Sequence, residues 1–374
     1  MRLLQPLRHR PVALLWSGLV LSAMGDQLYA VALTWIAVGV LGAGAGYLAA
    51  LQSGCILLSV LFAGYWLDRW NYRRVLIADH LVEAGALALV VVAWTHTGSA
   101  SPILLVLAVV VLSIGIGITR PAVQALLPEL VPDQALLPAV NALIDSTERM
   151  ARLAGPLIVG ALAGLLPEKH FLTLDALSFI AAATAMVLLP AARQRPPAPM
   201  AHGHNAVLRG YIALRRDMLL RDCWSVAAIA NGTWIVTFFL CVPLAIERAG
   251  VIGFGGSGLG AFGLVIACYG VTNFAALLIV GNRTMPFQPA RQVIAAKLVM
   301  MTGMAVVAIT AWCAPPDLLL PGFMLGAFVS APAGPMADVP IAYMRQTRMG
   351  PGQGLRMRFR VGCTQGSPAI QPGA

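Results

Sequence analysis

Acidic residues lie inside long apolar stretches of this 374-residue chain, where charged groups are unusual. Asp26 falls in the middle of the first stretch, and Asp79 and Glu83 are four residues apart in the third. In a membrane helix such residues are rare and typical of proton relays or substrate paths. Asp26 and Glu83 are therefore candidate proton carriers, and the alternative is a structural acid that is hydrogen-bonded to a neighbour. Asp175, near the end of another stretch, is expected to be solvated.

The fourth and fifth apolar stretches carry charges of both signs. Asp145 and Arg149, and likewise Glu148 and Arg152, are spaced by four residues. On a helix, each pair can neutralise itself. Arg120, near the end of the fourth stretch, is a candidate substrate or proton residue. Self-paired charges at one end of a membrane span are the alternative interpretation.

Residue sets for catalysis or cofactor binding are missing from the sequence. No Walker A motif is present, because neither of the two lysines follows a glycine-rich loop. His202 and His204 are only two possible ligands in a proline-rich segment, too few for a metal site. The six cysteines form no CxxC pair and are typical of small packing residues. We expect no enzyme activity, no cofactor and no metal.

The composition excludes a water-soluble fold. Apolar residues make up 59% of the chain, and only 11% are charged, against about 25% in soluble domains. Unbroken apolar runs of about 20 residues match the length of helix that crosses the ~30 Å hydrocarbon core of a bilayer. We predict an all-α polytopic membrane protein embedded in a lipid bilayer. Its ten predicted helices cover residues 12–40, 44–66, 75–95, 103–126, 139–165, 171–191, 223–246, 257–280, 293–314 and 318–343.

The basic residues indicate how these helices are oriented. Alternate loops carry 20 Lys and Arg residues on one side of the membrane and 2 on the other. Loops rich in Lys and Arg stay in the cytoplasm, so the N-terminus is predicted to be cytoplasmic. Basic loops on one side of the membrane account for the net charge of +10. It therefore does not indicate nucleic-acid binding.

A long basic segment divides the chain into two parts. Residues 192–222 begin with a proline-rich stretch that is typical of a linker. We predict a six-helix bundle at 1–191 and an incomplete four-helix bundle at 223–348. Residues 349–374 lack an apolar run and are expected to form a disordered basic tail.

The loop after the second helix contains a distinctive set of charges. A carboxylate among arginines can form a contact in one conformation and break it in another. This string resembles the loop 2–3 motif of the major facilitator superfamily. Asn71 stands where the motif has glycine, and asparagine tolerates a left-handed backbone. The residues that match the motif or its basic end are Gly64, Asp68, Arg69, Arg73 and Arg74.

A glycine–proline pair lies in the fifth helix. Gly155 and Pro156 remove one backbone hydrogen bond and allow close helix packing. With Gly160 they resemble the helix-five motif that the superfamily's exporters carry, although the spacing here is one residue longer.

The string from Gly25 to Leu33 and the end of the fourth helix resemble the macrolide-efflux and enterobactin-exporter-like branch of this superfamily. The resemblance implies a monomeric plasma-membrane transporter of the bacterial inner membrane that works by alternating access. It also implies proton-coupled export, by antiport, of a small, fairly apolar compound that is drug-like or siderophore-like. Uptake of a solute by the same fold is the alternative.

The family fold has twelve helices, and the sequence predicts ten of them. After Arg348 the composition changes abruptly to Gly, Pro and Arg. The chain is thus expected to be truncated after the tenth helix by a lost reading frame near residue 349. A ten-helix variant with a disordered tail is the alternative. Truncation predicts a poorly stable or non-functional transporter.

Overall fold

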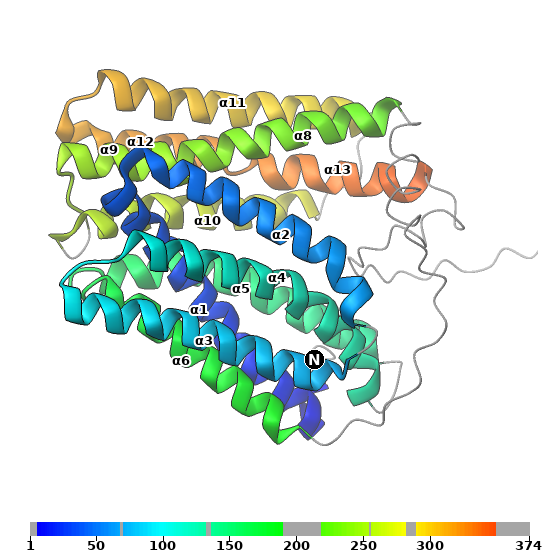
Figure 1. Cartoon of the computed structure of the whole chain (residues 1–374). Coiled ribbons are helices and arrows are strands. Elements are labelled where there is room, and N and C mark those ends of the chain that lie inside the picture. The colour runs from blue at the N-terminus through cyan, green and yellow to red at the C-terminus, as the bar shows by residue number, and fades with distance from the viewer. Residues whose placement is uncertain are drawn as a thin grey trace, which may run out of the picture.

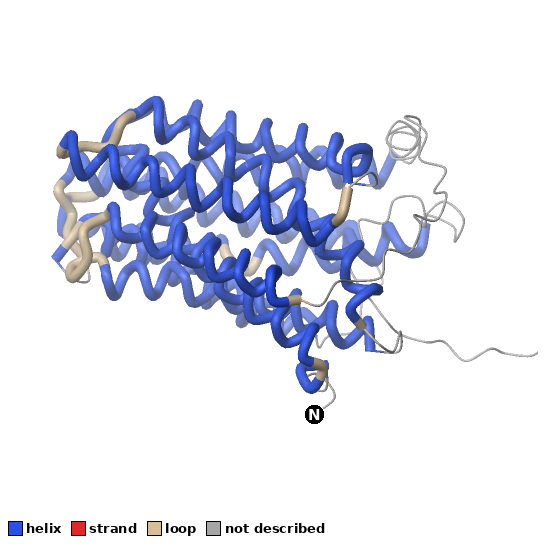
Figure 2. Tube along the Cα trace, turned by 60° about the horizontal axis from the view of Figure 1, so that its bottom comes forward, coloured by secondary structure: helices blue, strands red, loops and turns tan. Residues whose placement is uncertain are grey.

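The computed structural model describes residues 6–67, 70–131, 136–189, 218–253, 256–281 and 289–348. In these ranges the chain is almost entirely helical and contains no strand (Figure 2). The elements, in chain order, are α1 (Arg10–Leu41), the 3-10 helix η2 (Gly42–Gly44), α2 (Ala45–Leu67), α3 (Tyr72–Thr97), α4 (Pro102–Leu130), α5 (Leu137–Leu162), α6 (Lys169–Leu188), α8 (Met218–Val236), the π-helix η4 (Thr237–Cys241), α9 (Val242–Ala249), α10 (Gly258–Gly281), α11 (Pro289–Cys313), α12 (Pro316–Ser330) and α13 (Ala333–Arg348).

These elements agree with the predicted all-α membrane fold. The predicted range 223–246 is occupied by α8, η4 and α9 in succession, and the range 318–343 by α12 and α13. Within the described residues, eight helical segments are long and apolar enough to cross a membrane. The first of these, Arg10–Val60, contains α1 and most of α2, while α5 is not among the eight. Four charged residues near the middle of α5, Asp145, Glu148, Arg149 and Arg152, account for its absence.

The helices lie side by side in two groups (Figure 1). In the first group α6 packs on α1 and α3, and α4 packs on α2 and α3; in the second, α11 packs on α12 and α13. The largest contact between the groups joins α5 to α10. At one end of the molecule short connections join the helices, and we call it the short-loop end. We call the opposite end, where α3 and α11 begin, the long-loop end. The short-loop end holds the connections at 42–44, 98–101, 163–168 and 314–315, and the described residues 250–253, 256 and 257.

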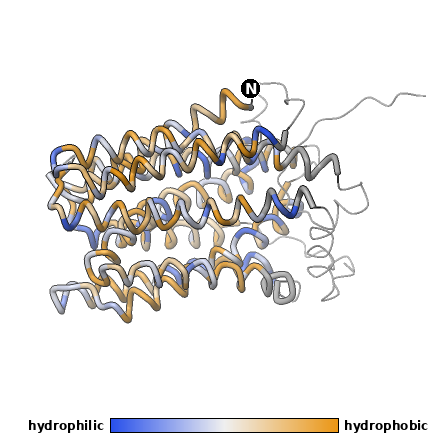
Figure 3. Tube along the Cα trace, turned by 90° about the horizontal axis from the view of Figure 1, so that it is seen from above, coloured by the Kyte–Doolittle hydropathy of each residue, from blue (hydrophilic) through white to orange (hydrophobic). Residues whose placement is uncertain are grey.

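The hydropathy of the residues changes along each helix. Apolar residues dominate the length of the helices, and many polar residues lie near their ends (Figure 3). Prolines stand in the first turns of α1, α4, α5 and α12, where no intrahelical partner is available for a backbone N–H. Gly98 ends α3 in the left-handed conformation, with φ of 79°.

Asn71 begins α3 as its N-cap. Its Oδ1 accepts a hydrogen bond from the backbone N–H of Arg74 at 3.2 Å. Its φ is −72°, so the backbone is extended and not left-handed. The left-handed backbone that asparagine tolerates is therefore not used at this position. Asparagine stands here because its side chain caps a helix.

Small residues let neighbouring helices approach closely. A Cβ on Gly18 of α1 would lie 3.0 Å from Ala185 Cβ on α6, and a Cβ on Gly326 of α12 would lie 2.9 Å from the carbonyl oxygen of Gly303 on α11. In a membrane, where apolar surface gains little by leaving lipid, such packing of backbone on backbone holds helices together.

The last predicted membrane helix is interrupted between α12 and α13. Pro335 has no N–H, which leaves the carbonyl oxygen of Ala331, four residues earlier, without its helical partner. Asn273 of α10 donates a hydrogen bond from Nδ2 to this oxygen at 2.8 Å. A backbone group that would be unsatisfied in lipid is thus satisfied by a side chain from another helix.

Candidate functional site

A carboxylate shared by two arginines forms the charged centre of the first helix group. Glu148 Oε2 accepts hydrogen bonds from Arg120 Nη2 at 2.8 Å and from Arg152 Nη2 at 3.3 Å. The predicted pair of Glu148 and Arg152 is therefore confirmed. Asp26 of α1 interacts electrostatically with Glu148 and Arg120. The structure thus gathers Asp26 and Arg120, two of the predicted proton or substrate residues, around one carboxylate.

The side chains of this centre are accessible although they lie within long helices. Arg120 and Arg152 are 64% and 60% exposed, and Glu148 is 32% exposed. Arg149, next along α5, is also exposed. For Asp145, the remaining member of the predicted charge pairs on α5, the side chain lies outside the described part of the structure.

The second helix group contributes charges that face this centre. Asp338 of α13 interacts electrostatically with Lys297 of α11 and with Arg149 of α5. This interaction crosses from one helix group to the other. Lys297 lies inside α11, as the predicted helix 293–314 implies, and it is only 5% exposed.

Two acids of α3 lie deeper in the first group. Asp79 Oδ2 accepts a hydrogen bond from Thr119 of α4 at 2.6 Å, and Glu83 Oε2 lies 3.1 Å from His80 Nδ1. Glu83 is 3% exposed. Carboxyl oxygens of Asp79 and Glu83 both lie against Gly115 of α4, where a Cβ would collide with Glu83. Glu83, the other predicted proton residue, is thus enclosed by α4 and by its own helix.

Asp175 is fully buried, at 0% exposure, so the expectation that it is solvated was wrong. It lies six residues into α6, roughly 9 Å from the start of the helix. Its Oδ1 accepts a hydrogen bond from Ser178 at 3.1 Å, and Gly25 of α1 packs directly on it. The close contact of α1 with α6 covers the carboxyl, and one sequence does not reveal which face of α6 meets α1.

An aromatic cluster in the second group was not predicted. The ring centroids of Trp234 and Tyr269 are 5.2 Å apart, and those of Trp234 and Phe239 are 5.3 Å apart. The cluster adjoins η4, a π-helix, and such bulges are frequent at functional sites. The spacing of Trp234, Phe238 and Phe239 by four and five residues was the available signal, although it did not reveal the π-helix.

The helix-five motif forms the contact between the groups. A Cβ on Gly263 of α10 would lie 3.0 Å from Gly160 Cα and 3.2 Å from the carbonyl oxygen of Pro156. On its other side, Gly155 packs against Gln27 of α1. The three residues Gly155, Pro156 and Gly160 therefore lie together between α1 and α10.

Further contacts between the groups lie at the short-loop end. The indole ring of Trp35 on α1 packs on Gly258 of α10, and its N–H donates a hydrogen bond to Glu168 Oε1 at 2.7 Å. Burial raises the pKa of Glu168, as does the negative charge of Glu247 on α9, while the hydrogen bond from Trp35 lowers it. Gly39 of α1 packs beside Glu247.

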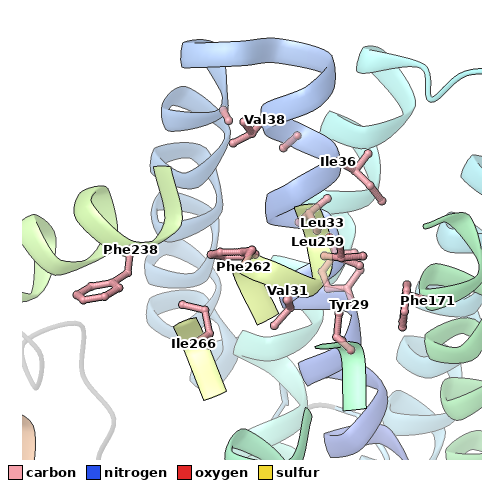
Figure 4. Packing of buried hydrophobic residues seen from close by; sticks show 14 of the residues in the cluster. Tyr29, Val31, Leu33, Ile36, Val38, Phe171, Phe238, Leu259, Phe262 and Ile266 are labelled. Carbon is pink, nitrogen blue, oxygen red and sulfur yellow. The ribbon is translucent and has the colours of Figure 1, made fainter. Parts of the chain in front are cut away.

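Apolar side chains from both groups join near these contacts. Figure 4 shows Val31 and Leu33 of α1 beside Leu259 and Phe262 of α10, and all four belong to one buried cluster. These contacts involve the last third of α1, the last turns of α5 and α9, the connection before α6 and the start of α10, all in the half of the molecule nearest the short-loop end. This end of the molecule is therefore closed between the groups.

The loop 2–3 residues are only partly described. Arg73 donates hydrogen bonds from Nε to the carbonyl oxygen of Met186 at 2.8 Å and from Nη2 to that of Val187 at 2.5 Å. It therefore caps the last turn of α6, where a positive charge is favourable. Arg74 is exposed. Gly64 is part of α2. Asp68 and Arg69 lie outside the described residues.

The described ranges contain no group of three His, Cys, Asp or Glu side chains that is arranged to hold a metal ion.

Long apolar helices packed in two groups, with Asp338 of one group in electrostatic contact with Arg149 of the other, define a polytopic membrane protein. The sequence profile of the Major Facilitator Superfamily matches residues 15–360, so the chain belongs to this superfamily. No curated protein sequence matches it.

Solved transporters share the fold at low sequence identity. A mutant of the nucleoside transporter NupG is 14% identical, with a TM-score of 0.67; 91% of this chain and 85% of that chain are covered. A bacterial homolog of the human lysosomal transporter Spinster, in an inward-facing and unoccupied conformation, is 13% identical, with a TM-score of 0.64 and coverage of 94% and 78%. A D-xylose–proton symporter is 15% identical, with a TM-score of 0.56 and coverage of 94% and 85%.

Proposed function

We propose that the chain is a proton-coupled secondary transporter that exports a small, fairly apolar compound by alternating access. The observation that carries this proposal is the carboxylate of Glu148, held by Arg120 and Arg152 beside Asp26. Charged side chains in a membrane protein almost always face the bundle interior or a water-filled path. The exposed arginines therefore mark a path between the two helix groups.

Protonation of Asp26 can be linked to the conformation of this site. When Asp26 is ionised it is attracted to Arg120 and repelled by Glu148. When Asp26 takes up a proton, both interactions are lost. Arg120 then remains paired with Glu148. A proton thus changes which partners hold the arginine, and such a change of contacts can bias two conformations of the bundle. Glu83 is the second candidate carrier of the proton.

Movement of the groups follows from the contacts between them. The glycine contact of α5 with α10 provides a smooth surface on which the two groups can pivot. The contacts of Trp35 with Gly258 and Glu168 close the short-loop end. In the proposed cycle, the first group (1–191) and the second group (223–348) rock about α5 and α10, and the site is exposed at one end at a time.

The proposed location is the bacterial inner membrane, with the N-terminus and the long-loop end in the cytoplasm. The distribution of Lys and Arg supports this orientation. The structure as described is then closed to the outside. A cysteine in place of the exposed Tyr47 should react with an impermeant thiol reagent added to intact cells, and one in place of the exposed Arg74 should not.

Transport by inverted membrane vesicles tests the function. With an inside-acid proton gradient, vesicles that contain the chain should accumulate a labelled macrolide or ethidium, and a protonophore should abolish the accumulation. Asp26→Asn and Glu83→Gln identify the proton carrier: full proton-coupled transport by both variants would contradict the assignment. Asp317→Asn, at an exposed position on α12, is the matched control.

Uptake of a solute by the same fold is the alternative direction. It is favoured by the similarity to a D-xylose–proton symporter, which shares the fold. Uptake predicts accumulation in right-side-out vesicles and none in inverted ones. A chain that is inserted in the membrane but moves neither probes nor protons would be a non-functional transporter.

A further inference from the structure

We propose that Asp175, together with Tyr29 and Glu83, forms a second proton-binding site inside the first helix group, apart from the charged centre at Glu148. The inference rests on the proposed function, because it concerns the ion that drives transport. It adds a carrier on α6 to the candidates on α1 and α3. Its ligand is a single proton.

Unpartnered polar atoms mark the site. Asp175 Oδ2 and Tyr29 Oη are buried and have no hydrogen-bond partner in the described part of the chain, and the same holds for His80 Nε2. The three residues are 0%, 5% and 1% exposed. Buried polar groups are normally satisfied by a hydrogen bond, since burying one without a partner is unfavourable. Such groups in a membrane bundle suggest a site that binds something polar.

The electrostatic interactions among these groups indicate that they lie near one another. The phenol of Tyr29 interacts with the carboxyl groups of Asp175, Asp26 and Glu83. Glu83 in turn interacts with Asp26 and Asp175. The hydroxyl of Tyr29 thus lies within electrostatic range of acids on three helices, α1, α3 and α6. A phenol is both a donor and an acceptor, so it can stabilise either protonation state of a neighbouring carboxyl.

Glycines keep the acids enclosed. Gly25 of α1 lies so close to Asp175 and Ser178 that a Cβ would collide with both, and Gly115 of α4 is equally close to Glu83. His80 stacks on Phe179 of α6, with ring centroids 5.7 Å apart. Packing against these glycines therefore restricts the two carboxyls, so they cannot easily move apart to relieve repulsion.

The charge balance favours a bound proton. Like charges that are withdrawn from water repel strongly. Asp175 and Glu83 have no arginine or lysine among the groups that influence them most, whereas Asp26 has Arg120. A proton bound to one of these acids would relieve the repulsion between them. The titratable and charged groups that face the site, by helix, are Asp26 and Tyr29 of α1, Asp79, His80 and Glu83 of α3, Arg120 of α4, Glu148 of α5 and Asp175 of α6.

Asp26 connects the enclosed site to the exposed charges, because it interacts with Asp175 on one side and with Glu148 and Arg120 on the other. A proton that enters from water at the charged centre forms an O–H bond on Asp26. That bond breaks when an O–H bond forms on Asp175. No other atom is gained or lost in this step.

Infrared difference spectroscopy on the purified full chain in lipid nanodiscs tests the site without any transport measurement. A change from acid to alkaline buffer should remove the carbonyl-stretch band of a protonated carboxyl in an apolar environment. Asp175→Asn should lose this band, and its amide oxygen can still accept the bond from Ser178. Tyr29→Phe removes only a hydroxyl without a partner and should shift the band. Asp317→Asn, on the exposed start of α12, is the control.

The proposal is overturned if the difference spectra of Asp175→Asn and Tyr29→Phe match that of the parent chain, or if sodium ions at constant pH produce the band change. If Asp175→Asn does not fold, Tyr29→Phe decides by the shift of the band. A parent chain that shows the Asp175 band but moves no probe in vesicles would contradict the proposed function and leave this site standing.

Discussion

Gly160 of α5 and Gly263 of α10 meet backbone to backbone, at the contact that joins the two helix groups. A Cβ on Gly263 would be 3.0 Å from both the Cα and the N of Gly160. No side chain separates the two helices at this point, so the groups can approach closely while retaining a smooth surface between them. This geometry gives the helix-five motif a mechanical role between the groups.

Gly263→Leu should therefore shift the chain away from the form that is closed at the short-loop end. Overpacking costs about 1–3 kcal/mol, and a bias of that size changes a population by roughly 5- to 150-fold. In a background without the native cysteines, Ile36→Cys, which is 2% exposed, should react faster with a thiol reagent when leucine is at position 263. Gly85→Leu, where a Cβ meets nothing within 4 Å, is the control. Equal reaction rates in the two variants would show that the contact does not hold this end closed.

Asn273 and Pro335 should be energetically coupled. Asn273→Leu leaves the carbonyl oxygen of Ala331 without a donor and should destabilise the chain by about 1–3 kcal/mol. In a Pro335→Ala background, residue 335 supplies its own N–H to that oxygen, so the same substitution should have a much smaller effect. Thermal unfolding of the four variants in detergent forms a double-mutant cycle. Additive effects would mean that Asn273 does not compensate for the proline.

Glu168 should make stability depend on pH. Its folded-state pKa is raised above the ordinary value of 4.5 by burial first and by Glu247 second. Between the ordinary and the raised pKa the folded chain binds more protons than the unfolded chain, so stability is highest below this window and falls as the pH rises through it. Glu168→Gln should remove this fall, as measured by thermal unfolding across pH.

Trp35→Phe is the complementary variant for that experiment. It removes the N–H that favours the ionised carboxylate, so the pKa of Glu168 should rise further and the fall in stability should extend to higher pH. If Glu168→Gln retains the pH dependence of the parent chain, another group is responsible.

Arg73 should stabilise the fold through the end of α6. Arg73→Ala removes two charge-assisted hydrogen bonds to carbonyl oxygens and should lower the free energy of unfolding by about 1.5–3 kcal/mol. Arg74→Ala, at the exposed neighbouring position, should change it by less than about 0.5 kcal/mol. Thermal unfolding of both variants provides the comparison, and equal losses would argue against the cap.

Much of this fold can be read from the sequence, since long apolar runs and prolines at their starts mark helices. Residue spacing also predicts contacts within one helix, such as Glu148 with Arg152. Contacts between helices are different. The burial of Asp175, the position of Lys297 and the bond from Asn273 to Ala331 depend on which helix faces meet, and one sequence carries no record of that rotation.

The resemblance to family motifs was useful where the motif residues act locally. It located Gly155, Pro156 and Gly160, but the contact of Gly160 with Gly263 required the structure because the partner lies 103 residues further along the chain. Arg73 matches the loop 2–3 motif, yet its hydrogen bonds are to backbone oxygens at the end of α6, which no pattern of residue types near position 73 indicates.

The central claim is that the two helix groups alternate between closure at the short-loop end and closure at the long-loop end. Pulsed electron–electron distance measurements in nanodiscs test it directly. One spin-labelled pair replaces Tyr47 and Ile252, which are 84% and 68% exposed at the short-loop end; the other replaces the exposed Arg74 and Arg291 at the long-loop end. We predict that a change of pH lengthens one distance and shortens the other. Distances that stay the same at both ends, or change in the same direction, would contradict alternating access.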